Sequence, residues 1–170
     1  MPTGLFFPII QGTRPTLDLK TKKVMDGLHW TAPHTVSVGT GTAVTVLIEV
    51  PAAGIYHLAG SVQIDKGGTW NFTSGPTCSA GTAMTAYNNN RRATNTTNLT
   101  LSHTVSSYST MGTALMPGTM ASGSSPMSIT GEFANETDWI LATSGTYLIR
   151  LVAGGAASNA YVVLRYWKES

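Results

Sequence analysis

The sequence predicts an all-β protein, a jelly-roll-like antiparallel β-sandwich or barrel of about eight strands preceded by an extended N-terminal arm. Three observations support this prediction. Apolar residues recur at every second position along most of the chain and almost never at helical spacing. These short runs are separated by turns rich in Gly, Pro, Asn and Ser. The chain ends in two long runs, 139–152 and 161–167, which are rich in aromatic and branched residues and predict a closing antiparallel hairpin.

Length and composition narrow the class of protein. At 170 residues the chain suits one domain with a sizeable core. Charged residues make up 11% of it, less than half the usual ~25%, which suits a surface largely covered by neighbours. A hydrophobic content of 42% argues against disorder. The net charge of +2 is too small to indicate a nucleic-acid partner.

The sequence gives no sign of export or membrane insertion. Its only N-terminal apolar run, 5–10, is too short for a secretion signal and lacks a basic start. No segment approaches the ~20 apolar residues that a membrane span needs. The single cysteine, Cys78, cannot form an internal disulfide. We expect a free thiol, in a protein that folds in a reducing cytoplasm.

The period-two pattern places the expected strands. In 42–50 the side chains of Val44, Val46, Ile48 and Val50 share one face, as in a half-buried strand. No helix is expected. After a turn at 51–54, further strands are expected over 55–65, 69–73, 83–87, 99–105 and 127–133. A long Gly/Ser/Met loop is expected over 111–126, and a short strand could lie inside it.

The expected domain organisation is an arm over residues 1–28 and a single sandwich domain over 29–170. Apolar residues near the start lie between Pro2, Pro8 and Pro15, and this proline spacing disfavours both a helix and a central strand. Basic residues follow, so the arm either is solvated or docks on an acidic protein surface. Its apolar tip needs cover from its own domain or from a partner.

Residues that could carry chemistry are sparse. Glu136 and Asp138 are the one close carboxylate pair and are expected to be turn residues rather than a glycosidase pair. No nucleophile motif surrounds Cys78. We therefore expect no enzyme activity, no cofactor and no metal. No metal-ligand spacing of i, i+2 or i, i+4 occurs among the histidines, which are His29, His34, His57 and His103.

Several segments resemble a group of small virion proteins of tailed bacteriophages. The similar segments are 50–56, the Asn-Asn-Asn-Arg-Arg turn at 88–92, 138–141, 145–150 and 161–167. This resemblance implies a jelly-roll domain, trimeric assembly and a place on the outer capsid surface of the virion as a decoration or cement protein. It also implies assembly in the host cytoplasm and the major capsid protein as partner. Neither nucleic acid nor a membrane is implied.

The last apolar run has a pattern that a trimer would explain. Apolar side chains lie on both faces of 161–167, so one face suits the domain core and a three-fold interface could cover the other. A central strand inside a sandwich would give the same pattern. The expected trimer-interface residues are Tyr161, Val163, Arg165, Trp167 and His103. The expected capsid-contacting residues of the arm are Phe6, Phe7, Ile9, Arg14, Lys20, Lys22 and Lys23.

Two alternatives belong to other functional classes. A phage fibre-head module would bind a host glycan through exposed tips such as Trp70, 87–92 and Tyr108, where aromatic rings lie beside Asn and Arg donors. A carbohydrate-active or metal-dependent jelly-roll enzyme is the other alternative. Its sites would need clustered carboxylates or histidines, which the spacing of these residues does not indicate.

Overall fold

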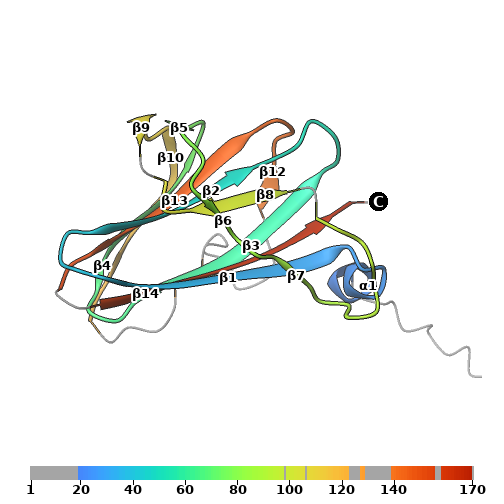
Figure 1. The fold of residues 1–170 in the computed structure, drawn as a ribbon, viewed down its shortest axis with the longest axis horizontal. Coiled ribbons are helices and arrows are strands. Elements are labelled where there is room, and N and C mark those ends of the chain that lie inside the picture. The colour runs from blue at the N-terminus through green and yellow to red at the C-terminus, as the bar shows by residue number, and fades with distance from the viewer. Residues whose placement is uncertain are drawn as a thin grey trace, which may run out of the picture.

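The computed structural model describes residues 19–97, 99–105, 107–122, 127–128, 139–155 and 158–169. Over these residues the protein is a β-sandwich in which two six-stranded antiparallel sheets pack face to face, with one short helix at one end (Figure 1). The all-β antiparallel sandwich is confirmed. The finer jelly-roll connectivity stays a prediction.

The first sheet, called sheet A, has β14 near its middle. The strand order is β11-β3-β14-β1-β7. β12 pairs with another part of β3, on the same edge as β11. All these pairings are antiparallel. The strands of sheet A are β1 (His29–Val38), β3 (Tyr56–Ile64), β7 (Tyr87–Asn88), β11 (Met127–Ser128), β12 (Trp139–Leu141) and β14 (Ser158–Lys168).

The second sheet, called sheet B, has the order β10-β4-β13-β2-β8-β6. Its strands are β2 (Ala43–Glu49), β4 (Gly68–Ser74), β6 (Thr82–Ala83), β8 (Thr100–His103), β10 (Thr113–Met120) and β13 (Thr146–Ala153). A separate two-stranded sheet joins β5 (Thr77–Cys78) to β9 (Tyr108–Thr110). The predicted strands at 42–50, 55–65, 69–73 and 99–105 correspond to β2, β3, β4 and β8.

The predicted closing hairpin is wrong. β13 lies in sheet B between β4 and β2, whereas β14 lies in sheet A between β3 and β1. The turn after β13 therefore crosses from one sheet to the other. The run 139–152 is itself divided by a turn at 142–145, so β12 and β13 also belong to different sheets. Both runs are apolar because each contributes central strands.

The secondary structure of three other segments differs from the one expected from the sequence. The segment 83–87 contributes only the ends of two short strands, β6 and β7. The expected loop 111–126 contains the eight-residue strand β10. Most of the expected strand 127–133 lies outside the described residues, apart from β11.

A helix, α1 (Leu19–Met25), replaces part of the expected extended arm. Its residues follow the last of the early prolines and include Leu and Lys, which are good helix formers. Gly27, at a φ of 70°, ends it in the left-handed region that favours glycine. Amide side chains hold this end, because Asn90 Nδ2 donates to the Met25 carbonyl at 2.8 Å and Asn88 Nδ2 to the Gly27 carbonyl at 2.8 Å. This end of the expected arm is therefore part of the folded domain.

The core lies between the two sheets and is built from alternate residues of each strand. Leu164 and Tyr166 of β14 are fully buried in it, as are Phe72 of β4 and Ile149 of β13. The Phe72 ring lies edge-on to Trp139 at a centroid distance of 5.5 Å and stacks on Tyr147 at 5.8 Å. Phe72 thus joins side chains from both sheets.

Replacing Phe72 by alanine should lower the free energy of unfolding by about 3 to 5 kcal/mol, because it removes a fully buried ring and leaves a cavity. Urea denaturation of purified protein would measure the change. Thr69→Ala is the matched control, since Thr69 is exposed on the same strand and should change stability by less than about 0.5 kcal/mol. A loss below about 1 kcal/mol for Phe72→Ala would contradict the proposed central packing.

Candidate interaction surface

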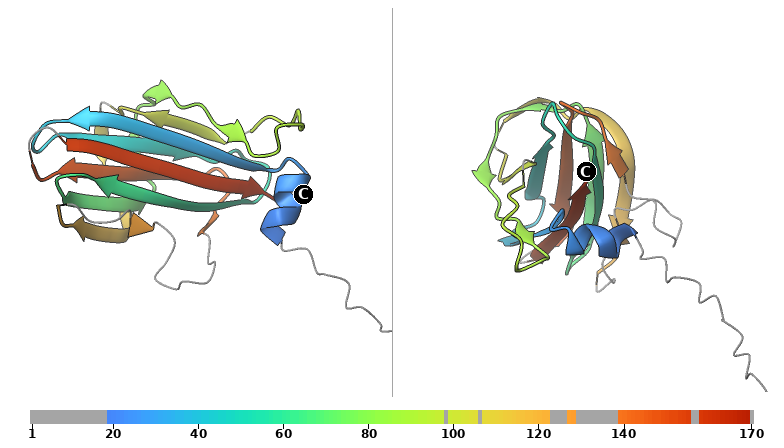
Figure 2. Two further views of the ribbon diagram at one scale, coloured as in Figure 1. Left: turned by 90° about the horizontal axis from the view of Figure 1, so that it is seen from below. Right: turned by 90° about the vertical axis from the view of Figure 1, so that its right-hand side faces the viewer.

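The face of sheet A that points away from the core is the main candidate site, and we call it the outer face of sheet A. It consists of every second residue of β1, β14 and β3, which lie side by side in Figure 2. Val163 on this face is partly buried and Arg165 is exposed, whereas the alternating residues Val162 and Leu164 are fully buried. The register gives its rows as His29–Trp167–His57, Thr31–Arg165–Ala59, Pro33–Val163–Ser61 and Thr35–Tyr161–Gln63.

One end of this face carries a stack of three rings. The Trp167 ring lies between His29, at a centroid distance of 5.9 Å and 9° between planes, and His57, at 4.9 Å and 7°. Because an imidazole covers each face of the indole, Trp167 is only 3% exposed although it belongs to the outward set. Ile140 of β12 pairs in register with His57 and is 67% exposed, so it extends the apolar end of the face.

Hydrogen bonds fix the two histidines of the stack. His57 Nε2 lies 2.7 Å from a Glu169 carboxylate oxygen. Asn89 Nδ2 donates to His29 Nδ1 at 2.6 Å, and Asn89 Oδ1 accepts from the Thr31 hydroxyl at 3.0 Å. The three rings are therefore held in place: Trp167 and His29 are buried, and His57 is partly buried.

The middle of the face carries one isolated charge. Arg165 is exposed, and across the described part of the chain its side chain has no hydrogen bond or ion pair. Its cross-strand neighbours, Thr31 and Ala59, are uncharged. The carboxylates near the two ends of the face have partners, since Asp65 accepts from Asn159 and Glu169 contacts His57. Arg165 is thus available to a carboxylate from another molecule.

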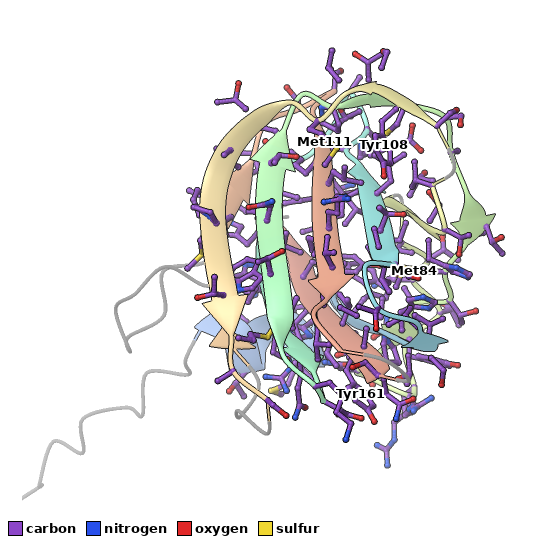
Figure 3. All side chains as sticks on the ribbon, turned by 90° about the vertical axis from the view of Figure 1, so that its left-hand side faces the viewer. Met84, Tyr108, Met111 and Tyr161 are labelled. Atoms are coloured by element: carbon purple, nitrogen blue, oxygen red, sulfur yellow. The ribbon has the colours of Figure 1, made fainter. Side chains whose placement is uncertain are left out.

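Two outward residues of sheet B are covered by other segments of the chain. Leu47 and Leu148 point away from the main core and are nevertheless buried, because Val105, Cys78 and Met111 pack over them. In Figure 3 Tyr108 and Met111 lie at the opposite side of the molecule from Tyr161 of sheet A. The chain therefore covers the apolar outward residues of sheet B with its own segments. Among the described residues no segment covers the corresponding centre of sheet A in Figure 2.

Packing also determines the state of the single thiol. Burial raises the pKa of Cys78, and the nearby Glu49 carboxylate adds to the rise. A raised pKa lowers the thiolate fraction at neutral pH, so the environment of Cys78 suits a structural thiol.

His103 lies apart from the other residues expected at the trimer interface. It belongs to β8 of sheet B, in register with Val46, and its ring stacks on His34 of β1 at a centroid distance of 4.1 Å. This pair joins the two sheets. The structure brings Tyr161, Val163, Arg165 and Trp167 together on one face, but it does not bring His103 to that face.

The basic and aromatic residues singled out in the sequence occupy varied environments. Phe6, Phe7, Ile9 and Arg14 lie outside the described residues, and Lys20 lies in α1. Lys22 pairs with Asp26 at 2.7 Å within the helix region, and Lys23 is buried at 5% exposure, which removes it from any contact surface. Of the expected glycan-binding tips, Trp70 is a core residue at 1% exposure, whereas Tyr87 and Tyr108 are exposed.

The residues that the structure describes contain no group of three or more His, Cys, Asp or Glu side chains that could hold a metal ion. Within the same residues, no helix has both the length and the apolar character needed to cross a membrane. No protein-family model matches the chain, and no curated protein sequence matches it.

Stability should fall on acidification because of the His34–His103 stack. Burial, with a further contribution from His103, lowers the pKa of His34 below 6.5 in the folded protein. The unfolded chain therefore binds more protons in this range, so the stability present above about pH 6.5 decreases as the pH falls toward the folded-state pKa. Urea midpoints measured at about pH 7.5 and about pH 5 should show the loss.

The variant His34→Asn provides the control for this pH dependence. It removes the titrating ring and should reduce the difference between the two urea midpoints. An equal difference in wild type and variant would assign the acid sensitivity to other groups.

Proposed function

We propose that this chain is a structural, non-enzymatic virion protein that decorates and cements the outer capsid surface of a tailed bacteriophage as a homotrimer. The partner is the major capsid protein, and assembly takes place in the host cytoplasm. The observation that carries the proposal is the outer face of sheet A, where Val163, Tyr161 and Ile140 leave apolar surface uncovered around Arg165. The resemblance of the chain to small phage virion proteins supplies the biological setting.

The composition of this face favours an interface with another protein surface. Strands of an antiparallel sheet that face water normally alternate apolar and polar residues, yet β14 presents the partly exposed Tyr161 and Val163 outward. Aromatic residues and arginine are enriched at protein interfaces, and lysine and acidic residues are depleted. Burying an extra ~1,000 Å² of apolar surface per subunit would contribute on the order of 25 kcal/mol before the costs of association. That amount is ample for an obligate assembly.

The topology supports a jelly-roll domain for this role. β1, β2, β3 and β4 alternate between sheet A and sheet B, and β12, β13 and β14 alternate in the same way. Such alternation is what two interleaved Greek keys produce. We therefore propose that the sandwich is a jelly roll.

A second candidate function is host-glycan binding by a fibre-head module. The observation in its favour is that Tyr87 is 46% exposed and that the Arg91 guanidinium lies 5.8 Å from the centroid of its ring. Exposed rings beside charged donors suit sugars. Co-sedimentation with phage tails rather than capsids would favour this function.

Light scattering followed by capsid sedimentation tests the proposal. A stable trimer that pellets stoichiometrically with expanded, undecorated capsids would support it. A trimer that does not bind capsids would favour the fibre head, and a monomer would contradict the interface.

Val163→Asp should dissociate the trimer without unfolding the subunit, because it places a charge on the outward side of β14. Light scattering should report the monomer mass, and circular dichroism should retain the β-sheet spectrum. Thr69→Asp is the control, since Thr69 is exposed on sheet B and should leave the trimer intact. A Val163→Asp protein that stays trimeric would place the interface elsewhere.

Deleting residues 1–18 should leave a folded trimer that no longer binds capsids. Deleting 1–28 should also lower stability, because Asn88 and Asn90 then lose the carbonyls to which they donate. Capsid sedimentation and urea denaturation of both deletions measure these effects. Normal decoration by the 1–18 deletion would contradict the role of the arm.

A further inference from the structure

A hollow lies where the end of α1 meets the turn at 89–92. Residues 65 positions apart in the sequence form its walls, as the bond between Asn90 and Met25 shows. Its volume is about 420 Å³, enough for one or two side chains of another molecule. The lining residues are Val24, Met25, Asn89, Asn90, Arg91 and Arg92.

Asparagine side chains hold the two walls in a fixed relation. Asn90 Nδ2 donates to the Met25 carbonyl at 2.8 Å, and Asn90 Oδ1 accepts from the Arg92 backbone N–H at 3.0 Å. Asn89 is engaged with His29 and Thr31 of β1. The amides that line the hollow are thus engaged in the protein's own structure, so the arginine side chains are the polar groups left for a ligand.

The charge around the hollow is positive and unpaired. Arg91 and Arg92 are exposed, and neither guanidinium has an ion pair in the part of the chain that the structure describes. The Arg91 guanidinium lies over the Tyr87 ring, which restricts its orientation. The nearby Asp26 carboxylate already pairs with Lys22 at 2.7 Å, so it does not neutralise the arginines.

The remaining wall of the hollow is apolar. Met25 is 62% exposed, and Val24 beside it is partly buried. A methionine thioether adapts to differently shaped apolar partners. The hollow therefore combines an adaptable apolar wall with two guanidinium groups.

We propose that this hollow binds a segment of a partner protein in which an apolar side chain lies next to carboxylates. The apolar side chain covers Met25 and Val24, and the carboxylates pair with Arg91 and Arg92 through charge-assisted hydrogen bonds. An apolar wall beside two guanidinium groups favours such a peptide over a nucleic-acid backbone, whose phosphates would leave Met25 exposed. This contact is separate from the outer face of sheet A and goes beyond the proposed function, because it states the chemistry of the partner.

Fluorescence anisotropy with a designed peptide tests the site. The probe is a fluorescein-labelled, end-blocked hexapeptide of sequence Glu-Glu-Leu-Glu-Glu-Leu, and the matched peptide has Gln in place of each Glu. The full chain should bind the acidic peptide and lose at least tenfold in affinity for the Gln peptide. R91M/R92M should weaken binding of the acidic peptide by at least tenfold, and M25S should also weaken it. K66M, which removes one exposed cation in the turn between β3 and β4, is the control and should bind like wild type.

Three outcomes would overturn the proposal: no binding of the acidic peptide by wild type, equal affinity in R91M/R92M, or equal loss in K66M. Thermal melts of each variant verify folding, and light scattering verifies the mass of the assembly. A variant that keeps its melting temperature and trimer mass but loses the peptide supports the site independently of capsid binding. A monomeric wild type that still binds the peptide would contradict the proposed trimer and leave this inference standing.

Discussion

Burial of every second side chain of β14 is the constraint on which the rest of the structure depends. Val162, Leu164 and Tyr166 are fully buried between the sheets, and β14 is bonded to β1 on one edge and to β3 on the other. Since side chains alternate along a strand, fixing these three inward directs Val163 and Arg165 outward. A slip of one residue would bring Arg165 into the core, where an unpaired charge is strongly unfavourable. The same pairing therefore sets both the core and the character of the outer face.

The protein presents three kinds of surface. On the outward side of sheet B, segments around Val105 and Met111 cover Leu47 and Leu148. The outer face of sheet A has Arg165 at its middle, paired carboxylates near its two ends, and the exposed Ile140 at one end. The α1 end is basic and hollowed. Distinct surfaces of this kind are consistent with the proposal of a subunit that contacts more than one neighbour.

The sequence patterns predicted where individual strands lie better than they predicted which strands pair with one another. β2, β3 and β4 were predictable because alternating branched residues bounded by turns are a local signal. The strands that pair with 139–152 were not predictable, because an alternating pattern does not indicate which strand lies alongside. β1 was not predicted, because Pro33 interrupts its alternating pattern. The outward residues of β14 were predictable for the same local reason as the strands. The enclosure of Trp167 by His29 and His57 depends on pairing between distant strands, as does the meeting of α1 with the arginine turn, and neither has a local signal.

The length of α1 has a consequence for the order in which the molecule forms. A helix of seven residues is too short to persist alone in water, so Leu19–Met25 becomes ordered only when Asn88 and Asn90 are in position to hold its end. Asn88 ends β7, and Asn90 lies two residues beyond it. β7 pairs with β1, and β1 pairs with β14, which is more than 100 residues later in the sequence. A helix that is synthesised before all the described strands is thus among the last elements to be fixed. By the same reasoning, copies in which β14 has not yet paired with β1 should lack the hollow between α1 and the turn at 89–92.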